Sequence, residues 1–294
     1  MATYNGEKYL RQQLDSILAQ TVPFTELIIC DDNSSDHTWE ILQEYSKNDS
    51  RIKIYRNKPN LGFVKNFEKG ISLATGDYIA LSDQDDIWLP RHLEILLNTI
   101  GDADLAVADA KLIDEEGNDL KETLSHATHL DYVPKDDIKK LYFMIFYISQ
   151  YHGMTMLLTK RLAQKAVPIP EEFEFHDRWL ALLACFTEGL NYTYEPVTLY
   201  RRLSDSKSGI KTRKPIIKTF LGHFLFKDKV LQEPPLYIEV IENKLKGALS
   251  VRQLKFIKTA KNYFRRRKFL IGRLYNILFE LMHFKKIYGV KIFH

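Results

Sequence analysis

Hydrophobic residues follow two different spacings along the first 210 residues of the chain. Short apolar runs predict buried strands at residues 27–30, 52–55 and 77–81. Between them, apolar residues at helical spacing predict helices over about 7–20, 37–47 and 63–74. Strand and helix therefore follow one another with short loops, which is typical of a mostly parallel α/β sheet flanked by helices. Further strands are expected at 105–108, 153–158 and 192–195, further helices at 92–100, 136–150, 160–166 and 175–184, and a loop at 119–137.

The start of the chain differs from what this pattern leads us to expect. A turn at Asn5-Gly6 comes directly after the first residues, whereas a doubly wound sheet normally opens with an apolar strand. We therefore expect the first strand to be truncated, with about five residues of it upstream of Met1. A sheet without this strand buries less apolar area, so its stability should be lower.

Aspartates follow two of the predicted strands, at the point where each strand ends. They are Asp31 and Asp32 after residues 27–30, and Asp83, Asp85 and Asp86 after residues 77–81. Because the carboxyl ends of parallel strands meet at one edge of a sheet, these side chains should converge. Crowded carboxylates raise one another's pKa unless a cation lies between them, and oxygen ligands suit Mg²⁺ or Mn²⁺. The pattern predicts a site for a metal ion and a diphosphate. The alternative is an acidic turn that caps the helix beginning near Pro90.

The composition narrows the class of protein. The chain has 294 residues, of which 45% are hydrophobic, and its two cysteines, Cys30 and Cys185, both lie in apolar runs. This favours a globular protein in a reducing compartment, without a disulfide framework. No secretory signal is visible after Met1, and the apolar run at 141–148 is far shorter than the ~20 residues of a membrane-spanning helix. We expect a cytoplasmic protein.

Charge divides the chain into two parts. Residues 211–294 hold 20 Lys and Arg against 5 Asp and Glu, a net of +15, whereas residues 1–210 hold 22 against 33, a net of −11. Such asymmetry indicates two regions with different partners. The acidic part can hold a cation, and the basic part favours an anionic surface.

The basic part is predicted to be helical from Pro234 onward, with an apolar stripe surrounded by lysines and arginines. The stripe consists of Leu270, Leu274, Ile277, Leu278 and Leu281. A basic helix with an apolar face fits the surface of an anionic membrane. The alternative is a helix packed on the first domain with solvated charges. Nucleic acid is not expected as a partner, because the basic segment carries no recognisable nucleic-acid-binding motif.

Six segments within residues 1–210 form an ordered set of motifs. They are Met1-Ala2-Thr3-Tyr4-Asn5-Gly6, Cys30-Asp31-Asp32-Asn33-Ser34, Asn60-Leu61-Gly62, Gly76-Asp77-Tyr78-Ile79, Ser82-Asp83-Gln84-Asp85-Asp86-Ile87-Trp88 and His176-Asp177-Arg178-Trp179. In this order they resemble glycosyltransferase family 2, in particular bacterial rhamnosyltransferase-like members that build cell-wall or surface polysaccharide. The resemblance implies a Rossmann-like GT-A fold, with a catalytic domain at 1–210 and a basic helical tail at 211–294. It is much less specific for the sugar.

The resemblance also implies roles in binding a nucleotide. The first turn, formed by Ala2, Thr3 and Tyr4, is similar to the segment that lines the base. Asp32, with Asp31 beside it, is similar to the residue that accepts a hydrogen bond from the pyrimidine ring N–H. Lys65 lies in a region that often offers a basic contact to the nucleotide. Asp83 and Asp85 resemble the Asp-x-Asp metal motif, in which Asp83 also faces the nucleotide and Asp85 is the more direct ligand of Mg²⁺ or Mn²⁺.

The resemblance further implies an inverting transfer of a sugar from a nucleoside-diphosphate donor, such as dTDP-rhamnose or a UDP-hexose. The acceptor is a hydroxyl of a growing, lipid-linked glycan at the inner face of the plasma membrane. Asp177 falls where family members keep the general base, which takes the proton of the acceptor hydroxyl. From the residues alone, Asp177 is also explained as a carboxylate favoured by the dipole at a helix N-terminus.

One position departs from the family pattern. Members of this subgroup often carry a His soon after the Tyr-Arg of the last core strand, and here that position is Leu203. Arg201 or Arg202 neutralises the diphosphate instead, or metal dependence is reduced, or activity is lost. Two other functions stay open. One is a nucleotidyltransferase, for which we see no triphosphate-binding loop near the N-terminus. The other is a non-catalytic nucleotide-sugar-binding partner in a glycan assembly complex.

Overall fold

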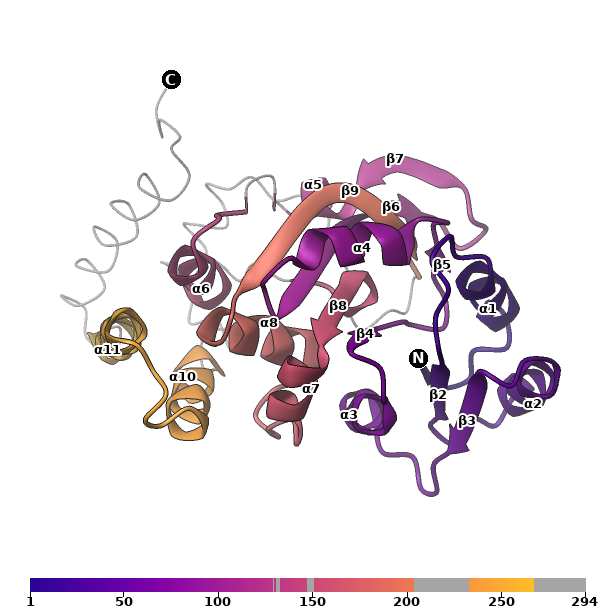
Figure 1. Ribbon diagram of the computed structural model, residues 1–294, viewed down its shortest axis with the longest axis horizontal. Coiled ribbons are helices and arrows are strands. Elements are labelled where there is room, and N and C mark those ends of the chain that lie inside the picture. The colour runs from indigo at the N-terminus through magenta and orange to yellow at the C-terminus, as the bar shows by residue number, and fades with distance from the viewer. Residues whose placement is uncertain (129, 131–132, 147–150, 204–232, 267–294) are drawn as a thin grey trace. The chain divides into compact units, whose positions relative to one another are not determined.

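A computed structural model describes the chain except for residues 129, 131–132, 147–150, 204–232 and 267–294 (Figure 1). The chain divides into two compact units, one formed by 1–131 with 150–210 and the other by 132–149 with 211–294. The sequence analysis did not predict that 132–149 group with the C-terminal part. Each unit is described by itself below.

The first unit begins with a parallel sheet of three strands in the order β1-β2-β3. These strands are β1 (Ala2–Thr3), β2 (Leu27–Asp31) and β3 (Ile52–Arg56), and the helices α1 (Leu10–Leu18), α2 (Thr38–Asn48) and α3 (Phe63–Leu73) alternate with them. Every residue of β2 is buried, as its unbroken apolar run predicts. In α1, Leu10, Leu14 and Ile17 recur every three or four residues and pack in one core cluster with Ile29 of β2. The predicted alternation of strand and helix is confirmed here.

A second sheet completes the first unit, with strand order β4-β8-β6-β9-β5 and β7 paired to β6. Its strands are β4 (Tyr78–Ala80), β5 (Ile87–Trp88), β6 (Leu105–Ile113), β7 (Asp119–Thr123), β8 (Met156–Thr159) and β9 (Leu190–Arg201). Only the pairing of β6 with β9 is parallel, and all its other pairings are antiparallel. The predicted α/β fold is confirmed, and its parallel character is concentrated in the first sheet.

Four helices and one short turn accompany the second sheet. They are α4 (His92–Ile100), α5 (Leu124–Ala127), α7 (Lys160–Ala166), α8 (His176–Phe186) and the 3₁₀ turn η1 (Gly153–Thr155). Helix α8 is almost wholly buried, and the indole N–H of Trp179 donates to the carbonyl of Ala166 on α7. The expectation of a loop at 119–137 was wrong for its first part, where β7 and α5 lie. Because β7 is an edge strand with mostly exposed side chains, its sequence carries no alternation of apolar and polar residues.

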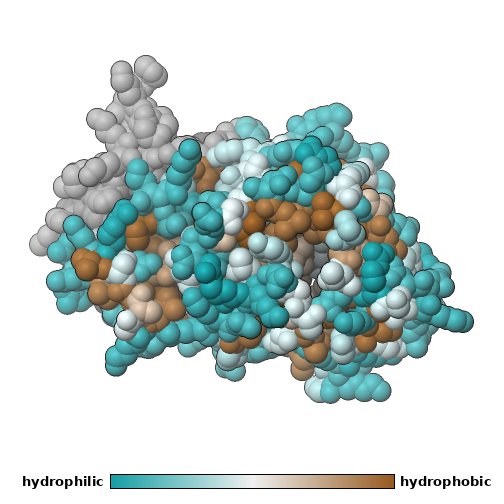
Figure 2. All heavy atoms as spheres, in the orientation of Figure 1, coloured by the Kyte–Doolittle hydropathy of each residue, from teal (hydrophilic) through white to brown (hydrophobic). Residues whose placement is uncertain are grey.

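Between β2 and β4 the first unit contains an apolar cavity of about 300 Å³. Residues of both strands line it, together with residues of α3 and α4. Figure 2 shows hydrophobic residues at the surface over this part of the unit, where α4 and β4 lie in Figure 1. The N–H of Ala2 in β1 donates to the carbonyl of Ser82, 3.3 Å away, which connects β1 to the segment that follows β4. The strand expected upstream of Met1 stays a prediction.

The described helices of the second unit are α6 (Asp137–Phe146), α10 (Glu233–Lys244) and α11 (Val251–Arg266). Phe256, Ile257 and Ala260 form part of the buried side of α11, and the ring of Phe256 meets Tyr142 of α6 edge-on at 5.0 Å. No helix in the part of the chain that the structure describes is long and apolar enough to cross a membrane. The predicted stripe from Leu270 to Leu281 lies outside the described residues.

Candidate active site

The first unit holds a cleft of about 530 Å³ at the carboxyl ends of β1 and β2. Segments far apart in the sequence line it, and its acidic residues are Asp32, Asp83, Asp85 and Asp177. Of the other predicted site residues, Ala2, Thr3, Tyr4 and Arg201 also line the cleft, whereas Asp31, Lys65 and Arg202 are not among its lining residues. This volume lies within the range of about 300–1,000 Å³ that is usual for small-molecule sites.

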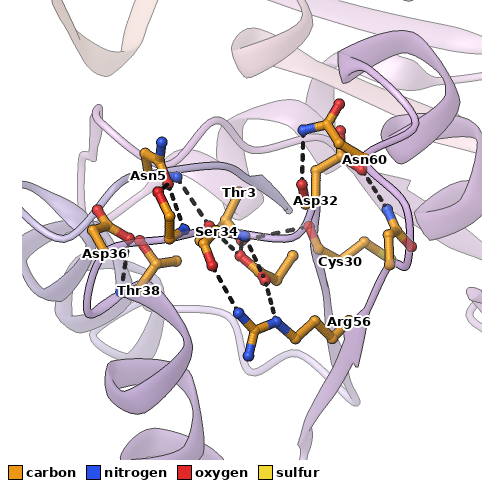
Figure 3. A network of polar contacts seen from close by, with 12 residues as sticks. Thr3, Asn5, Cys30, Asp32, Ser34, Asp36, Thr38, Arg56 and Asn60 are labelled. Atoms are coloured by element: carbon orange, nitrogen blue, oxygen red, sulfur yellow. Dashed lines mark hydrogen bonds and ion pairs between the residues drawn. The ribbon is translucent and has the colours of Figure 1, made fainter.

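Asp31 is surrounded by donors from Thr3, Ser34 and Arg56, which lie close together at the end of β2 (Figure 3). Its carboxylate is completely buried, accepts hydrogen bonds from the N–H and hydroxyl of Ser34, and lies 3.4 Å from Nε of Arg56. The hydroxyl of Thr3 also donates to it at 3.4 Å. The negative charge of Asp31 is therefore balanced by the protein itself, which is what a buried carboxylate requires.

Asp32 is equally well satisfied, and it holds the loop that leads into α3. Its Oδ1 accepts from the N–H of Leu61 and from Asn57, and its Oδ2 accepts from the N–H of Gly62, all at 2.8 Å. Gly62 has a φ of +81°, which favours glycine at the position before the helix. Asp32 thus orders the segment 60–62, and it is also one of the residues that line the cleft.

The carboxylates of Asp83 and Asp85 have a different environment. Among the described residues, no side-chain or backbone donor outside this segment hydrogen-bonds to either of them. Burial and the neighbouring charges of Asp85 and Asp177 raise the pKa of Asp83 to about 7, and burial raises the pKa of Asp85. Beneath them, Asp86 is 1% exposed and uses Oδ1 to accept the N–H of Arg201, while its Oδ2 has no partner among the described residues. Burial, Asp85 and Asp83 raise its pKa as well.

Asp177 lies at the N-terminus of α8 and lines the same cleft. Its Oδ1 accepts the N–H of Arg178 at 2.6 Å, and its Oδ2 accepts the N–H of Gly153, from the turn η1, at 3.3 Å. Burial raises the pKa of Asp177 to about 6, although these two backbone N–H groups act in the opposite direction. A carboxylate with a pKa close to neutral is suited to take a proton and to release it again.

Gln84, between the two metal-motif aspartates, was missed by the sequence analysis. Its side-chain oxygen accepts the N–H of Tyr4 at 2.8 Å, and its side-chain nitrogen donates to the carbonyl of Tyr4 at 3.0 Å. Gly6 passes so close that a Cβ there would lie 2.3 Å from Oε1 of Gln84. Gln84 therefore joins the predicted base-lining turn to the Asp-x-Asp segment. The amino-acid sequence around Gln84 did not indicate that it hydrogen-bonds to Tyr4.

An aromatic wall was also missed. Phe63 and Phe67 of α3 line the cleft together with Phe175 and His176. The ring of His176 stacks on Phe67 with centroids 3.9 Å apart, and Phe63 meets Phe175 at 5.8 Å. Sequence periodicity assigned the phenylalanines of α3 to a helix, and nothing in it indicated that they face a ligand site.

Arg201 is 3% exposed, and its guanidinium donates hydrogen bonds within the protein. It donates to the carbonyls of Asp85 and Glu115 at 2.9 and 3.0 Å and to Gln12 at 2.8 Å, and its centre lies 4.4 Å from the ring of Tyr9. This arrangement fastens the Asp85 segment to the end of β9.

The other predicted basic residues are engaged elsewhere. The ammonium of Lys65 pairs with Glu68 at 2.9 Å, and the N–H of Arg202 donates to the carbonyl of Ile113. Leu203 lines the cleft.

The donor set of Asp83 and Asp85 fits a hard divalent cation. In the described chain these two carboxylates accept no hydrogen bond from outside their own segment, and burial raises the pKa of both, so they offer oxygen ligands and gain from a positive charge between them. In the described part of the chain, no group of three or more His, Cys, Asp and Glu side chains is placed to hold a metal alone. Mg²⁺ commonly completes its shell with water and with phosphate oxygens of a substrate, so two protein carboxylates suffice.

The two sheets, with aspartates at their joined edge, define the chain as a GT-A type fold. It is similar to residues 1–349 of S. aureus TarS in complex with UDP-GlcNAc, with a TM-score of 0.59 and 17% identity, over 97% of this chain and 77% of that one. It is also similar to the mannosyltransferase PcManGT from Pyrobaculum calidifontis in complex with GDP-Man and Mn²⁺, with a TM-score of 0.52 and 13% identity, over 95% and 86%. At these identities the likeness concerns the fold alone.

Residues 1–163 match Glycosyl transferase family 2, and the chain belongs to this family. It is 32% identical over 209 residues to the putative glycosyltransferase EpsH of Bacillus subtilis, over 68% of this chain and 59% of EpsH. It is 26% identical over 288 residues to the GalNAc(5)-diNAcBac-PP-undecaprenol beta-1,3-glucosyltransferase of Campylobacter jejuni, over 96% and 87%. The chain spans about half the length of the first curated relatives it matches. The resemblance drawn from the motifs is confirmed.

Proposed function

We propose that the protein is an inverting glycosyltransferase that uses a nucleoside-diphosphate sugar, such as dTDP-rhamnose or a UDP-hexose. The observation that carries this proposal is that Asp177 shares one cleft with Asp83 and Asp85. Among the described residues, Asp83 and Asp85 accept no hydrogen bond from outside their own segment, so both are suited to a cation and a diphosphate. Asp177, in the same cleft, has a pKa raised to about 6, which suits a base. Family membership supports the same reaction class.

In the proposed reaction, the acceptor oxygen forms a bond to the anomeric carbon while the bond from that carbon to the diphosphate breaks. The acceptor proton passes to Asp177, and the nucleoside diphosphate leaves with the electron pair of the broken bond. A single displacement of this kind inverts the anomeric centre. A cation bound by Asp83 and Asp85, Mg²⁺ or Mn²⁺, supplies charge neutralisation for the leaving diphosphate.

The chain's own residues would hold the nucleotide over β1. Ala2, Thr3 and Tyr4 line the cleft, and Gln84 keeps this turn in place through two hydrogen bonds to Tyr4. Asp32, which lines the cleft, is the proposed acceptor for a base N–H, through a lone pair that residues 57–62 do not use. We propose an indirect role for Arg201: it holds the segment that carries Asp85, rather than touching the diphosphate.

A panel of nucleotide sugars tests the proposal. The full-length protein would be incubated with dTDP-rhamnose, UDP-glucose, UDP-GlcNAc and GDP-mannose, with Mn²⁺, with Mg²⁺ or with EDTA, and release of nucleoside diphosphate would be measured. We expect turnover of one donor class that EDTA lowers and that Mn²⁺ or Mg²⁺ restores. Nucleotide binding without turnover of any donor, even with a lipid-linked glycan present, would instead indicate the non-catalytic binding partner.

We further propose that the protein works at the inner face of the plasma membrane on a lipid-linked glycan. The Campylobacter relative is named for an undecaprenol-linked substrate. In this chain, α11 has a suitable surface, because all six of its charged residues are basic: Arg252, Lys255, Lys258, Lys261, Arg265 and Arg266. They lie on the exposed side, where Val251 and Leu254 are 83% and 48% exposed. Since the aromatic side of α11 is buried in its own unit, binding would rest on charge rather than on deep insertion.

Vesicle flotation tests this location. Replacing Lys255 and Lys258 by Gln is expected to weaken binding to phosphatidylglycerol vesicles by about 30-fold, since each basic residue near such a surface contributes about 1 kcal/mol. Two exposed lysines on helices of the first unit, Lys47 and Lys165, serve as a matched control when replaced by Gln. Equal losses in both double variants, or binding that does not need anionic lipid, would count against a role for α11.

A further inference from the structure

The turn η1 approaches the proposed base more closely than any side chain there would allow. The N–H of Gly153 donates to Oδ2 of Asp177 at 3.3 Å. The turn is itself anchored, because Thr155 donates to the carbonyl of His152 at 3.0 Å and Thr198 of β9 donates to the carbonyl of Met154 at 3.3 Å. A donor on a fixed turn can therefore hold one oxygen of Asp177 in a defined direction.

The ring of His176 lies next to Gly153. It is 6% exposed and stacks on Phe67, with centroids 3.9 Å apart and planes 18° apart. Neither ring nitrogen has a hydrogen-bond partner among the described residues, so packing rather than hydrogen bonding keeps the ring in place. The ring has little freedom to move away from η1, since Phe67 is buried behind it.

The absence of a side chain at position 153 is a steric requirement. A Cβ there would lie 2.9 Å from Nε2 of His176 and 3.7 Å from Cβ of Asp177. The backbone of Gly153 is not in the left-handed region, so glycine is not needed for its conformation. A methyl group would push apart the turn and the start of α8, and with them the donor and acceptor of the Gly153–Asp177 hydrogen bond.

We propose that Gly153 is a positioning residue for sugar transfer: its lack of a side chain lets η1 close on His176, and its N–H aims the carboxylate of Asp177 at the acceptor hydroxyl. This inference rests on the proposed role of Asp177. The two N–H donors, from Gly153 and Arg178, hold one lone pair on each carboxylate oxygen, and the lone pairs that remain are the ones that can meet the acceptor. Displacing reacting groups by about 1 Å can cost on the order of 10²-fold in rate.

Gly153→Ala tests the inference through the split between kcat and binding. We expect kcat to fall by about 10- to 100-fold, because the base is misplaced, while KM for the donor and the Kd of the nucleoside diphosphate stay within about twofold. The matched control is Gly70→Ala in α3, where the nearest atom to a new Cβ is Sγ of Cys30 at 3.9 Å. It should leave kcat unchanged. Wild-type kcat in Gly153→Ala would overturn the inference.

A double variant separates positioning from general damage. His176→Asn shortens the side chain that a methyl group at 153 would strike, so Gly153→Ala combined with His176→Asn should be at least tenfold faster than additive losses would give. Strictly additive losses would overturn the inference. If Gly153→Ala alone does not fold, the double variant still decides: a kcat within tenfold of His176→Asn supports the inference, and an inactive or unfolded double variant overturns it.

Failure of the inference and failure of the proposed function can be told apart. If Asp177→Asn keeps its turnover, the base has been assigned wrongly, whatever Gly153→Ala does. If Asp177→Asn is inactive but Gly153→Ala turns over like the wild type, only the positioning role of Gly153 fails.

Discussion

Two groups of aspartates, one after β2 and one after β4, have their negative charges balanced in opposite ways. Asp31 and Asp32, at the end of β2, are buried and accept hydrogen bonds from Ser34, Leu61, Gly62 and other residues nearby. Asp83 and Asp85, after β4, are partly buried and have no such donors among the described residues. The charges of Asp31 and Asp32 are balanced by donors of the protein, whereas the charges of Asp83 and Asp85 are left for a cation or another ligand to balance.

This difference shows how the same residue type serves structure in one place and chemistry in another. A satisfied carboxylate stabilises the fold, because its donors would otherwise be buried without partners. A carboxylate without donors, crowded by Asp85 and Asp177, costs stability and has a raised pKa, as Asp83 shows. Such a cost is typical of functional sites, where a ligand or cation removes it. The following predictions test that contrast, beginning with the largest effect.

Replacing Asp177 by Asn should have the largest effect. We expect kcat to fall by about 10²- to 10⁴-fold, because that is the usual contribution of a general base. Nucleoside-diphosphate binding, measured by isothermal titration, should survive, since the amide keeps the shape of the side chain. Asp102→Asn, on an exposed loop, is the control and should be fully active. Retained turnover in Asp177→Asn would remove Asp177 from the role of base.

Replacing Asp32 by Ala should destabilise the protein by about 3 kcal/mol, because each buried donor left without an acceptor costs about 1–3 kcal/mol. Here the donors are the N–H groups of Leu61 and Gly62 and the amide of Asn57. Urea unfolding followed by circular dichroism measures the loss. Asp83→Asn in the same assay, without metal, should be as stable as the wild type or more so. Equal destabilisation by both variants would mean that the two groups of aspartates do not differ.

The contrast also predicts a pH dependence for Asp83. Its pKa is raised to about 7 from the usual value near 4, so between these pH values the folded state binds more protons than the unfolded state. The contribution of Asp83 to stability therefore falls as pH rises through this window. In EDTA, Asp83→Asn should melt about 2–4 °C above the wild type at pH 8, and the gap should close toward pH 4.

Mn²⁺ supplies the control for this pH effect. It should raise the melting temperature of the wild type at pH 8 by more than that of Asp83→Asn, because the variant lacks one of the two proposed ligands. If the difference in melting temperature between the two proteins depends on neither pH nor Mn²⁺, the negative charge of Asp83 does not destabilise the fold in the way proposed.

The smallest predicted effect concerns Arg56, which helps to balance the charge of Asp31. Arg56 lies 3.4 Å from Asp31 and donates to the carbonyl of Ser34 at 2.7 Å. Because its side chain is about one-third exposed, Arg56→Gln should cost only about 1 kcal/mol of unfolding free energy. Nucleotide binding should not change. A large loss of affinity without loss of stability would place Arg56 and Asp31 in the ligand site rather than in the scaffold.

Much of the fold could be predicted from local patterns. The stripe of Leu10, Leu14 and Ile17 gave α1 correctly, and the apolar run before Asp31 gave β2. The edge strand β7 could not be predicted, because neither of its faces is consistently buried. The antiparallel pairings of β8 were also invisible, since they depend on contacts with strands some 50 and 80 residues away.

For the candidate site, the sequence indicated which carboxylates stand at strand ends but not how each is surrounded. Asp31 and Asp83 look alike in the sequence, as acidic residues that follow a short apolar run. The roles of Gln84 and Gly153 could not be predicted either. Gln84 binds Tyr4, 80 positions away, and Gly153 binds Asp177, 24 positions away.

Local patterns in the amino-acid sequence are enough to predict the order of most strands and helices and the position of aspartates at the strand ends, because periodicity and strand ends are local properties of the chain. Which of these aspartates are neutralised, and which are left for a ligand, follows from the folded chain alone. The reason is physical: the state of a buried charge depends on the donors and charges within a few ångströms, and for Asp32, Asp83 and Asp177 these come from distant segments of the chain.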